Sequence, residues 1–387
     1  MTRIGIITIV KVNNYGAELQ AFALEKKLQQ LGYNTEIIDY LYYKNWRYKD
    51  SKISSSFIKM NLKQRISYWI KYRLINFSMD CICPLFNNQI KKRIHNFSEF
   101  HKRNTKFSKE YSSMPALYNN CSSYDIYMVG SDQVWNPFTS SSIEPYFLTF
   151  APKEKKKIAY ASSFGISEIP DSLKERFQKL LDNLDYISVR EQSGVTLVKE
   201  LSNKKVHLVL DPTLLLNKTD WSKVMKQYPN MPSKYILIYQ LSDSKAIVEL
   251  ALKISKQYNL KVYRICKRAY ANTHNKGIIN IADAGPAEFL SLICNATYIV
   301  TNSFHGTAFS INFNVPFYSI VSAKKKNNSR LESLLNVTKL NSRLLRDDIP
   351  IDSINISNQI DYTTANEQLE LYRKASEKYL IDSIENQ

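Results

Sequence analysis

The sequence predicts an α/β protein made of two Rossmann-like domains that face a central cleft, with a basic helical insertion in the first. Apolar segments of strand length alternate with segments of helical periodicity along most of the chain. Its 387 residues are too many for one ordinary core. We place the N-terminal domain at residues 1–215 and the C-terminal domain at 216–361, and we expect a helix over 362–387 that packs back on the N-terminal domain.

The N-terminal domain begins with a strand, a helix and a second strand. Residues 3–10 are apolar, helical spacing starts at Gly16 and stops near Gly32, and residues 35–39 are again strand-like. The same alternation resumes after an interruption, with strands expected at 124–130, 157–162, 186–189 and 206–210 and helices at 171–184 and 195–201.

The interruption is the stretch 41–110, which carries most of the excess positive charge. It holds 16 Lys or Arg against 4 Asp or Glu, so a net +12 of the formal +18 lies here, interleaved with aromatic residues. We expect a mostly helical insertion that binds nucleic acid, an acidic membrane surface or a lipid-linked anionic substrate, or that is only a solvated helical face. No helix-turn-helix, zinc or RNP motif accompanies it, so nucleic acid is not expected as a partner.

The C-terminal domain shows the same alternation. Pro286 suits the first turn of a helix, where no amide donor is needed. The expected strands are 235–239, 261–266, 298–301 and 316–321, and the expected helices are 245–258, 286–295 and a segment that ends near residue 312.

Composition excludes several classes of protein. No apolar run approaches the ~20 residues of a membrane span, and the first strand lacks the features of a signal peptide. The five cysteines form no Cys-x-x-Cys pair and the five histidines lack metal-ligand spacing. We therefore expect a cytoplasmic protein with free thiols and no metal site.

Ligands of parallel α/β sheets bind beyond the carboxyl ends of the strands, so polar loops at those ends are the candidates. His305 lies in such a loop and can move a proton in either direction near neutral pH. Gly306 lets a helix begin close to a ligand and direct its amides at an anion. The alternative is a histidine that only satisfies backbone groups at a helix start.

Three other loops favour ligand binding, each with an alternative. Arg190 can hold a phosphate or carboxylate with its planar fork, or pair with Glu191 or another acid. The loop 131–136 can bind sugar hydroxyls while Trp135 stacks on a sugar face, or Trp135 can be a core anchor. The helix start at 14–16 suits a phosphate or a hydroxyl-rich ligand, although Asn is also an ordinary N-cap.

Together these segments resemble the polysaccharide pyruvyl transferase family, in the expected order over about residues 3 to 345. The matching stretches are NYGAELQAFAL at 14–24, YD at 124–125 with GSDQVWN at 130–136, AYASSFG at 159–165, SVRE at 188–191, DPT at 211–213 and TNSFHGT at 301–307.

The resemblance implies a fold like that of GT-B glycosyltransferases and transfer of a pyruvyl group from phosphoenolpyruvate to sugar hydroxyls as a ketal, without a cofactor. It implies that His305 is the general acid or base and that Arg190 binds the phosphate or carboxylate of the donor. Some members carry an arginine two residues before the histidine, where this chain has Ser303. Arg330 and Arg343 are candidates for the missing cation.

The expected sites follow from these segments and the resemblance. Asp132 or Glu288 can handle the second proton of the reaction. The donor is expected at Asn14, Tyr15, Gly16, Ser303, Gly306, Thr307 and Arg330. The saccharide acceptor is expected at Ser131, Asp132, Gln133, Trp135, Asn136, Ser162 and Glu288.

The expected acceptor is a lipid-linked or nucleotide-linked precursor of a surface polysaccharide at the inner face of the membrane, which residues 41–110 can contact. One alternative is a nucleotide-sugar-dependent glycosyltransferase of the same fold. Another is a non-catalytic, membrane-associated assembly protein.

Overall fold

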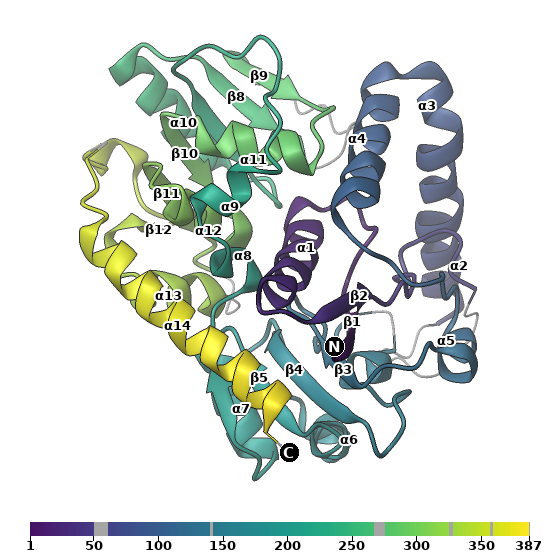
Figure 1. Cartoon of the computed structure of the whole chain (residues 1–387). Coiled ribbons are helices and arrows are strands. Elements are labelled where there is room, and N and C mark those ends of the chain that lie inside the picture. The colour runs from purple at the N-terminus through teal and green to yellow at the C-terminus, as the bar shows by residue number, and fades with distance from the viewer. Residues whose placement is uncertain (50–60, 140–141, 267–274, 325–327, 357–358, 387) are drawn as a thin grey trace. The chain divides into compact units, whose positions relative to one another are not determined.

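The computed structural model describes residues 1–49, 61–139, 142–266, 275–324, 328–356 and 359–386 (Figure 1). Residues 50–60 of the expected insertion lie outside the described residues. The chain divides into two compact units. The first comprises Met1–Phe86, His101–Leu215 and Arg373–Gln387, and the second comprises Asn87–Phe100 and Leu216–Tyr372.

A parallel six-stranded sheet forms the centre of the first unit, in the order β2-β1-β3-β4-β5-β6. Its inner strands read as nearly continuous apolar runs because helices cover both faces of a parallel sheet. The strands are β1 (Arg3–Ile7), β2 (Asn34–Ile37), β3 (Ile126–Val129), β4 (Lys156–Ser162), β5 (Tyr186–Val189) and β6 (Val206–Leu208).

Helices alternate with these strands along the chain. They are α1 (Tyr15–Gln30), α5 (Met114–Asn120), η4 (Glu144–Phe147), α6 (Asp171–Asp182), α7 (Gln192–Leu201) and α8 (Pro212–Leu215). The expected insertion is helical over most of residues 62–104, as α2 (Leu62–Trp69), η2 (Ile70–Ile75), η3 (Ser78–Ile82), α3 (Cys83–Phe86) and α4 (Asn88–Asn104). Its described residues 41–49 and 105–110 are not helical.

The second unit has its own parallel six-stranded sheet, in the order β12-β11-β10-β7-β8-β9. The strands are β7 (Ile236–Tyr239), β8 (Val262–Ile265), β9 (Ile278–Ile281), β10 (Tyr298–Thr301), β11 (Phe317–Val321) and β12 (Leu344–Arg346). The helices are α9 (Lys218–Ser222), α10 (Lys245–Tyr258), α11 (Pro286–Cys294), α12 (Phe304–Asn312), α13 (Ser329–Val337), η5 (Asn341–Arg343), η6 (Ile351–Ser353) and α14 (Thr363–Glu385).

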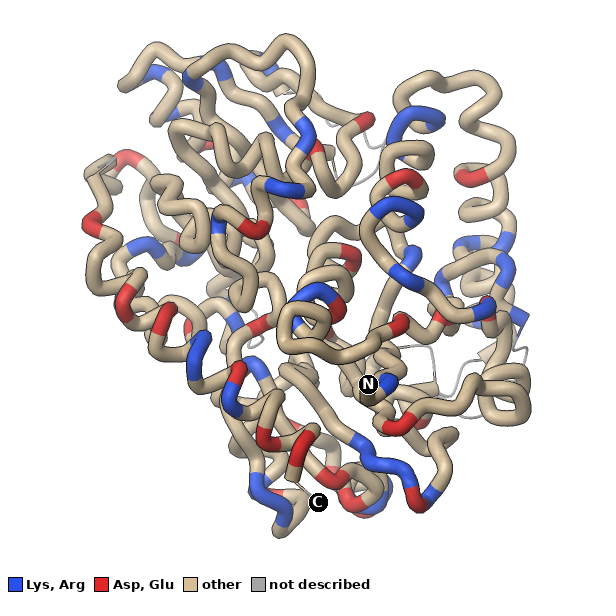
Figure 2. The backbone as a smooth tube through the Cα atoms, viewed as in Figure 1, with Lys and Arg blue, Asp and Glu red and all other residues tan. Residues whose placement is uncertain are grey.

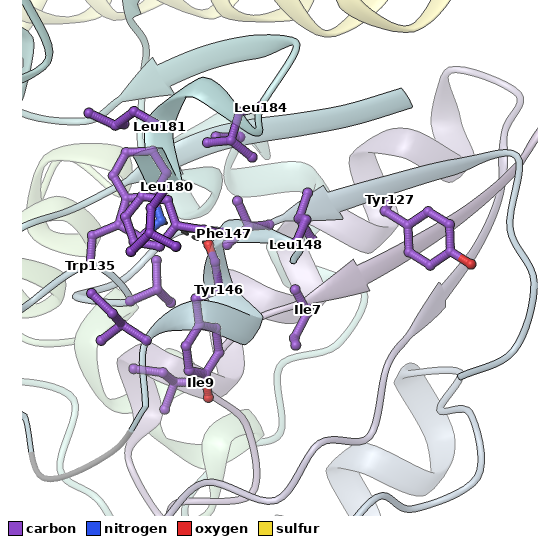
Figure 3. Close-up of a cluster of buried hydrophobic side chains, with 14 of the residues drawn as sticks. Ile7, Ile9, Tyr127, Trp135, Tyr146, Phe147, Leu148, Leu180, Leu181 and Leu184 are labelled. Atoms are coloured by element: carbon purple, nitrogen blue, oxygen red, sulfur yellow. Dashed lines mark hydrogen bonds between the residues drawn. The ribbon is translucent and has the colours of Figure 1, made fainter. Parts of the chain in front are cut away.

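Each unit has a separate hydrophobic core. In the first, Trp135 and Phe147 pack with Leu180 and Leu181 of α6 and with Leu184, which follows that helix, as Figure 3 shows. In the second, Ile236 and Ile238 of β7 pack against Ile247 of α10. Two cores in one chain confirm the prediction of two α/β units with parallel sheets.

The division into units departs from the expected domain bounds within α4. Residues Asn87–Phe100 of α4 belong to the second unit, where Arg93 donates a hydrogen bond to the carbonyl of Cys266 (3.2 Å) and Asn96 to that of Asp283 (3.0 Å). Helix α14 is shared: it begins in the second unit, and its residues from Arg373 onward belong to the first unit, on which the C-terminal helix is expected to pack. There Tyr379 donates a hydrogen bond to the carbonyl of Ala159 in β4 at 2.9 Å. Strands β9 and β12 and helix α13 were not expected.

Candidate active site

Each unit carries polar side chains at the carboxyl ends of its parallel strands, where ligands of such sheets bind. The first unit holds the expected residues Asn14, Tyr15, Gly16, Ser131, Asp132, Gln133, Trp135, Asn136, Ser162 and Arg190. The second holds the expected residues Glu288, Ser303, His305, Gly306, Thr307 and Arg330. The two groups are described separately.

Arg190, directly after β5, is fully buried in a cluster of acids that we call the Arg190 cluster. Its guanidinium donates to Asp211 Oδ2 at 2.7 Å and to Ser131 Oγ at 3.3 Å. A further nitrogen lies 3.4 Å from Asp132 Oδ1, and Nε lies 3.8 Å from Glu191 Oε2. Three carboxylates thus surround one guanidinium. This arrangement corresponds to the second possibility given for Arg190 from the sequence, which is pairing with acids of the protein.

The charge balance of the Arg190 cluster bears on what it can bind. Burial by itself would lower the pKa of Arg190, but the carboxylates of Asp211, Asp132 and Glu191 raise it above its ordinary value. The guanidinium therefore stays charged, and its fork faces acids of the protein. In this structure Arg190 therefore positions the 131–132 loop through Ser131 and Asp132, and its role in binding a donor stays a prediction.

The loops after β3 and β4 are joined to each other through their backbones. The amide of Ser163 donates to the carbonyl of Asp132 (3.0 Å), and the amide of Trp135 donates to the carbonyl of Ser163 (3.2 Å). Ser162 donates its hydroxyl to the carbonyl of Gly130 at 3.1 Å. Asp132 has a φ of 75°, a conformation that costs energy for a residue with a side chain and recurs at functional sites. Its partly exposed carboxylate is thus held in place by two loops.

Gln133 and Asn136 complete this loop with contacts to each other and to the next loop. Asn136 donates to Gln133 Oε1 at 3.2 Å. The Gln133 side chain packs on Gly165, where an added Cβ would lie only 2.6 Å from Gln133 Cδ. Both amide side chains therefore shape the loop, and each remains partly exposed.

Trp135 anchors the core and has no exposed ring face (Figure 3). Its ring stacks on Phe147 with centroids 4.8 Å apart, and its Nε1 donates to the carbonyl of Tyr146 at 2.8 Å. A sugar cannot stack on a ring that is 0% exposed. We therefore leave Trp135 out of the proposed acceptor site, in favour of the core-anchor alternative.

Asn14 caps helix α1, which is the alternative to ligand binding that the sequence left open for this residue. Its Oδ1 accepts hydrogen bonds from the amides of Gly16 (3.0 Å) and Ala17 (3.4 Å), and Tyr15 is buried. The preceding loop contains Lys11 and Asn13 in the left-handed region, with φ of 56° and 51°. This loop is thus held in a conformation that few side chains adopt freely.

Four charged side chains that we did not predict as functional support the β1–α1 loop. Glu18 accepts from the amide of Val12 at 3.0 Å and pairs with His101 Nε2 at 2.6 Å. Lys11 pairs with Asp39, which follows β2. Burial alone would lower the pKa of His101, but the Glu18 carboxylate raises it above its ordinary value. Local spacing does not reveal this cluster, because its members are separated by up to 90 residues.

In the second unit, His305 is the second residue of α12, and every residue of that helix is buried. Ser303 is the N-cap, and its Oγ accepts from the amide of Gly306 at 3.3 Å. Thr307 Oγ1 donates to the carbonyl of Ser303 at 3.1 Å. Ser303 and Thr307 therefore fix the first turn of α12, and the His305 ring, 7% exposed, lies edge-on to Phe304.

Gly306 is required by the close approach of α12 to the sheet. A Cβ at this position would lie 2.5 Å from Thr301 Oγ1 and 3.1 Å from Tyr239 Cδ1. Thr301 and Tyr239 are paired neighbours at the ends of β10 and β7. The glycine thus brings the start of α12, and with it His305, onto the carboxyl ends of two strands.

The loops after β7 and β10 are tied together by one asparagine. Asn302 accepts from the amide of Leu241 at 2.7 Å and donates to the carbonyl of Ser242 at 2.8 Å. Between β7 and Leu241 lies Gln240, whose buried Oε1 has no hydrogen-bond partner within the described ranges. A buried acceptor of this kind at a strand end is a candidate ligand contact that we did not predict. The unremarkable sequence around Gln240 offers no signal for it.

Glu288 and Arg330 have different surroundings from those expected. Glu288 Oε2 accepts from the amide of Gly285 at 3.1 Å, and Oε1 pairs with Lys226 at 3.0 Å. It is therefore a buried helix cap of α11, and we leave it out of the acceptor site and of the proton transfer. Arg330 is half-buried in the first turn of α13. Arg343 donates a hydrogen bond to the hydroxyl of Tyr298 at 3.4 Å and lies over the ring of Tyr318.

Metal-binding side chains do not gather in the part of the chain that the structure describes. No group of three or more His, Cys, Asp or Glu there has a geometry that could hold a metal ion. The five cysteines are free. A search of the described helices for a membrane span, by length and apolar character, finds none.

The comparison with protein families finds one match to most of the chain. A model described as polysaccharide pyruvyl transferase matches residues 14–323, a range that includes both the Arg190 cluster and His305. No curated protein matches the chain.

The solved structures to which the chain is similar include an epimerase, a phosphatase domain and a transferase. For UDP-GlcNAc 2-epimerase from Neisseria meningitidis the TM-score is 0.47 at 11% identity, covering 99% of both chains. For the trehalose-6-phosphate phosphatase N-terminal domain of Candida albicans it is 0.48 at 10% identity, covering 99% of this chain and 97% of the other. For the heptosyltransferase WaaC of E. coli it is 0.39 at 9% identity, covering 96% of this chain and 99% of the other.

Proposed function

Because the chain belongs to the polysaccharide pyruvyl transferase family, we propose that it transfers a pyruvyl group from phosphoenolpyruvate to two hydroxyls of a saccharide. Two new C–O bonds form at the enol carbon, and the C–O bond to phosphate breaks. One hydroxyl proton ends on the methylene carbon, which becomes a methyl group, and the other leaves with the phosphate. The products are a cyclic ketal and inorganic phosphate.

The observation that carries this proposal is the position of His305. The imidazole stands in the first turn of α12, at the carboxyl ends of β10 and β7, and the helix N-terminus favours anions there. An imidazole near neutral pH can deliver the proton that the methylene carbon needs. We assign His305 to that proton transfer and the surrounding strand ends, including Gln240, to the donor.

The strand ends of the first unit are assigned to the saccharide. Asp132 is a partly exposed carboxylate held by Arg190 and by the loop after β4, so it can accept a proton from a hydroxyl. Gln133 and Asn136 lie in the same loop and offer amide groups to further hydroxyls. Ser131 and Ser162 direct their hydroxyls at protein groups, so they support this loop.

The cation that must complement the donor carboxylate and phosphate is assigned to Arg330. Ser303 occupies the position where other family members can carry an arginine, and it is fully buried as the cap of α12. Arg330 begins a helix of the same unit and is half-buried. We also propose a cytoplasmic location, which the five free thiols fit, and a precursor of a surface polysaccharide as the acceptor.

The test measures phosphate release from phosphoenolpyruvate with a panel of saccharide acceptors, together with detection of an acid-labile ketal. We expect His305→Ala to lower the rate by about 10²–10⁴-fold. The control is His95→Ala, which removes an exposed histidine of α4. Full activity of the His305→Ala variant would remove His305 from the mechanism. Release of a nucleotide from a nucleotide sugar, with no turnover of phosphoenolpyruvate, would identify a glycosyltransferase instead.

A further inference from the structure

The segment Leu62–Phe86, which we call the apolar arm, is helical along most of its length yet none of its residues is buried. It comprises α2, η2, η3 and α3. Of the 14 large hydrophobic side chains exposed within the described ranges, 10 belong to it. They are Leu62, Ile66, Trp69, Ile70, Leu74, Ile75, Phe77, Ile82, Leu85 and Phe86.

Helices in folded proteins ordinarily bury their apolar face, because packing supplies most of their stability. The next helix along the chain, α4, does so, with Ile90, Phe97 and Phe100 all buried. In the apolar arm, Leu62, Ile66 and Trp69 follow the same helical spacing but remain exposed. A concentration of exposed apolar side chains of this kind marks an interaction surface.

The opposite face of the apolar arm contacts the rest of the first unit, and these contacts hold the exposed face outward. The Tyr43 ring stacks with Tyr68 (centroids 6.2 Å apart) and meets Tyr72 edge-on (5.5 Å). Arg73 donates to the carbonyls of Tyr43 (3.2 Å) and Asn45 (2.8 Å). These contacts use the polar and aromatic side chains of the helix and leave its aliphatic side chains outside.

Basic residues accompany the exposed apolar ones. The apolar arm has four basic residues, of which Lys63, Arg65 and Lys71 are exposed, against a single acid, Asp80. In Figure 2, basic residues recur along α2. Helices that combine Leu, Ile and Trp with Lys and Arg bind at the surface of anionic membranes, where tryptophan prefers the interface.

We propose that the apolar arm docks on the surface of an anionic phospholipid bilayer, with its aliphatic side chains and Trp69 in the interfacial layer and its basic side chains on lipid phosphates. A second copy of this chain would bring an equally basic surface against the arm. Nucleic acid would satisfy the charge but leave the aliphatic side chains in water. The lipid surface is the occupant that satisfies both features. This inference does not rest on the proposed transferase activity.

The test uses the full chain with vesicles of phosphatidylcholine, alone or mixed with phosphatidylglycerol, and measures the bound fraction by sedimentation. We expect binding to the mixed vesicles only, weakened by salt. The double variant Ile66→Ser, Ile70→Ser should lower the partition coefficient at least about tenfold, because two aliphatic side chains no longer enter the interface. The variant Lys63→Glu, Lys71→Glu should reduce the preference for anionic lipid.

The matched control is Leu371→Ser, which removes an exposed aliphatic side chain (59%) from another helix, α14. It should bind vesicles as the parent chain does. Absence of binding to the anionic vesicles, or equal binding by the double variant, would overturn the proposal. A concentration-dependent dimer that the double variant abolishes would assign the surface to a second copy. No substrate is present, so the outcome is independent of catalysis.

Discussion

The Arg190 cluster yields a prediction about stability that separates a positioning role from donor binding. In Arg190→Ala, the buried carboxylates of Asp211 and Glu191 and the nearby Asp132 lose their shared cation. Removal of one partner from a buried ion pair costs about 3–5 kcal/mol. For a unit of this size that corresponds to a decrease in Tm of roughly 6–20 °C.

Thermal unfolding followed by circular dichroism measures this change, with Arg47→Ala as the control. Arg47 forms an exposed pair with Glu110 at 2.8 Å, so its replacement should change the free energy of unfolding by no more than about 1 kcal/mol. Arg190→Lys retains the charge but not the fork, and should fall between the two.

The result that would refute the reasoning is an Arg190→Ala protein as stable as the parent. A second outcome is equally decisive. If Arg190→Lys folds with an unchanged Tm and loses only the stabilisation that added phosphoenolpyruvate provides, then Arg190 binds the donor and its acid partners release it on binding.

Three further changes test the physical argument elsewhere in the chain. Burial raises the pKa of Glu25 to about 8, although the hydrogen bond from the Lys106 amide partly opposes this shift. Between pH 4.5 and 8 the Glu25 carboxyl is therefore protonated in the folded state and ionised in the unfolded chain, so the free energy of unfolding falls as the pH rises through this range. Glu25→Gln should therefore increase the free energy of unfolding at pH 7 by up to about 3 kcal/mol, and a loss of stability on urea unfolding would contradict this. The pKa of His101 is raised, so its ion pair with Glu18 stabilises the fold fully below about pH 6.5 and less as the pH rises through the pKa of the folded state. His101→Gln should therefore flatten the dependence of Tm on pH above 6.5. An unchanged slope would show that this ion pair does not contribute to stability. Gly306→Ala places a Cβ 2.5 Å from Thr301 Oγ1 and should cost about 1–3 kcal/mol together with most of the activity, whereas parental Tm and turnover would show that α12 can shift.

The fold was predictable because the apolar patterning is strong and regular. Strands β5 and β10 and helix α10 have the bounds expected from the sequence. The short strands β9 and β12 were missed, because alternating polar residues such as Asn280 and Arg346 weaken the apolar signal of so short a segment. The assignment of Asn87–Phe100 to the second unit was also missed, since it depends on tertiary contacts such as that of Arg93 with Cys266.

The position of the candidate loops at strand ends was predictable, whereas the contacts of each side chain were not. The polar loops at 131–136, 190–191 and 302–306 do lie at strand ends, as topology requires. Trp135 and Glu288 look the same in sequence whether they face a ligand or the protein, and only burial and hydrogen bonding assign them to the protein. Gln240 was not predicted as a candidate ligand contact, because nothing in its local sequence distinguishes a buried hydrogen-bond acceptor from an exposed one.

The sharing of α14 affects the order in which the chain can fold during synthesis. The first unit includes Arg373–Gln387, where Ser376 accepts a hydrogen bond from the amide of Leu210 and Tyr379 reaches β4. Between Leu215 and Arg373 lie the 157 residues Leu216–Tyr372 of the second unit. At about 5–20 residues per second, a ribosome needs roughly 8–30 s to supply them. During that interval the surface of β4 that α14 later contacts is uncovered, and a chaperone can bind the nascent chain there.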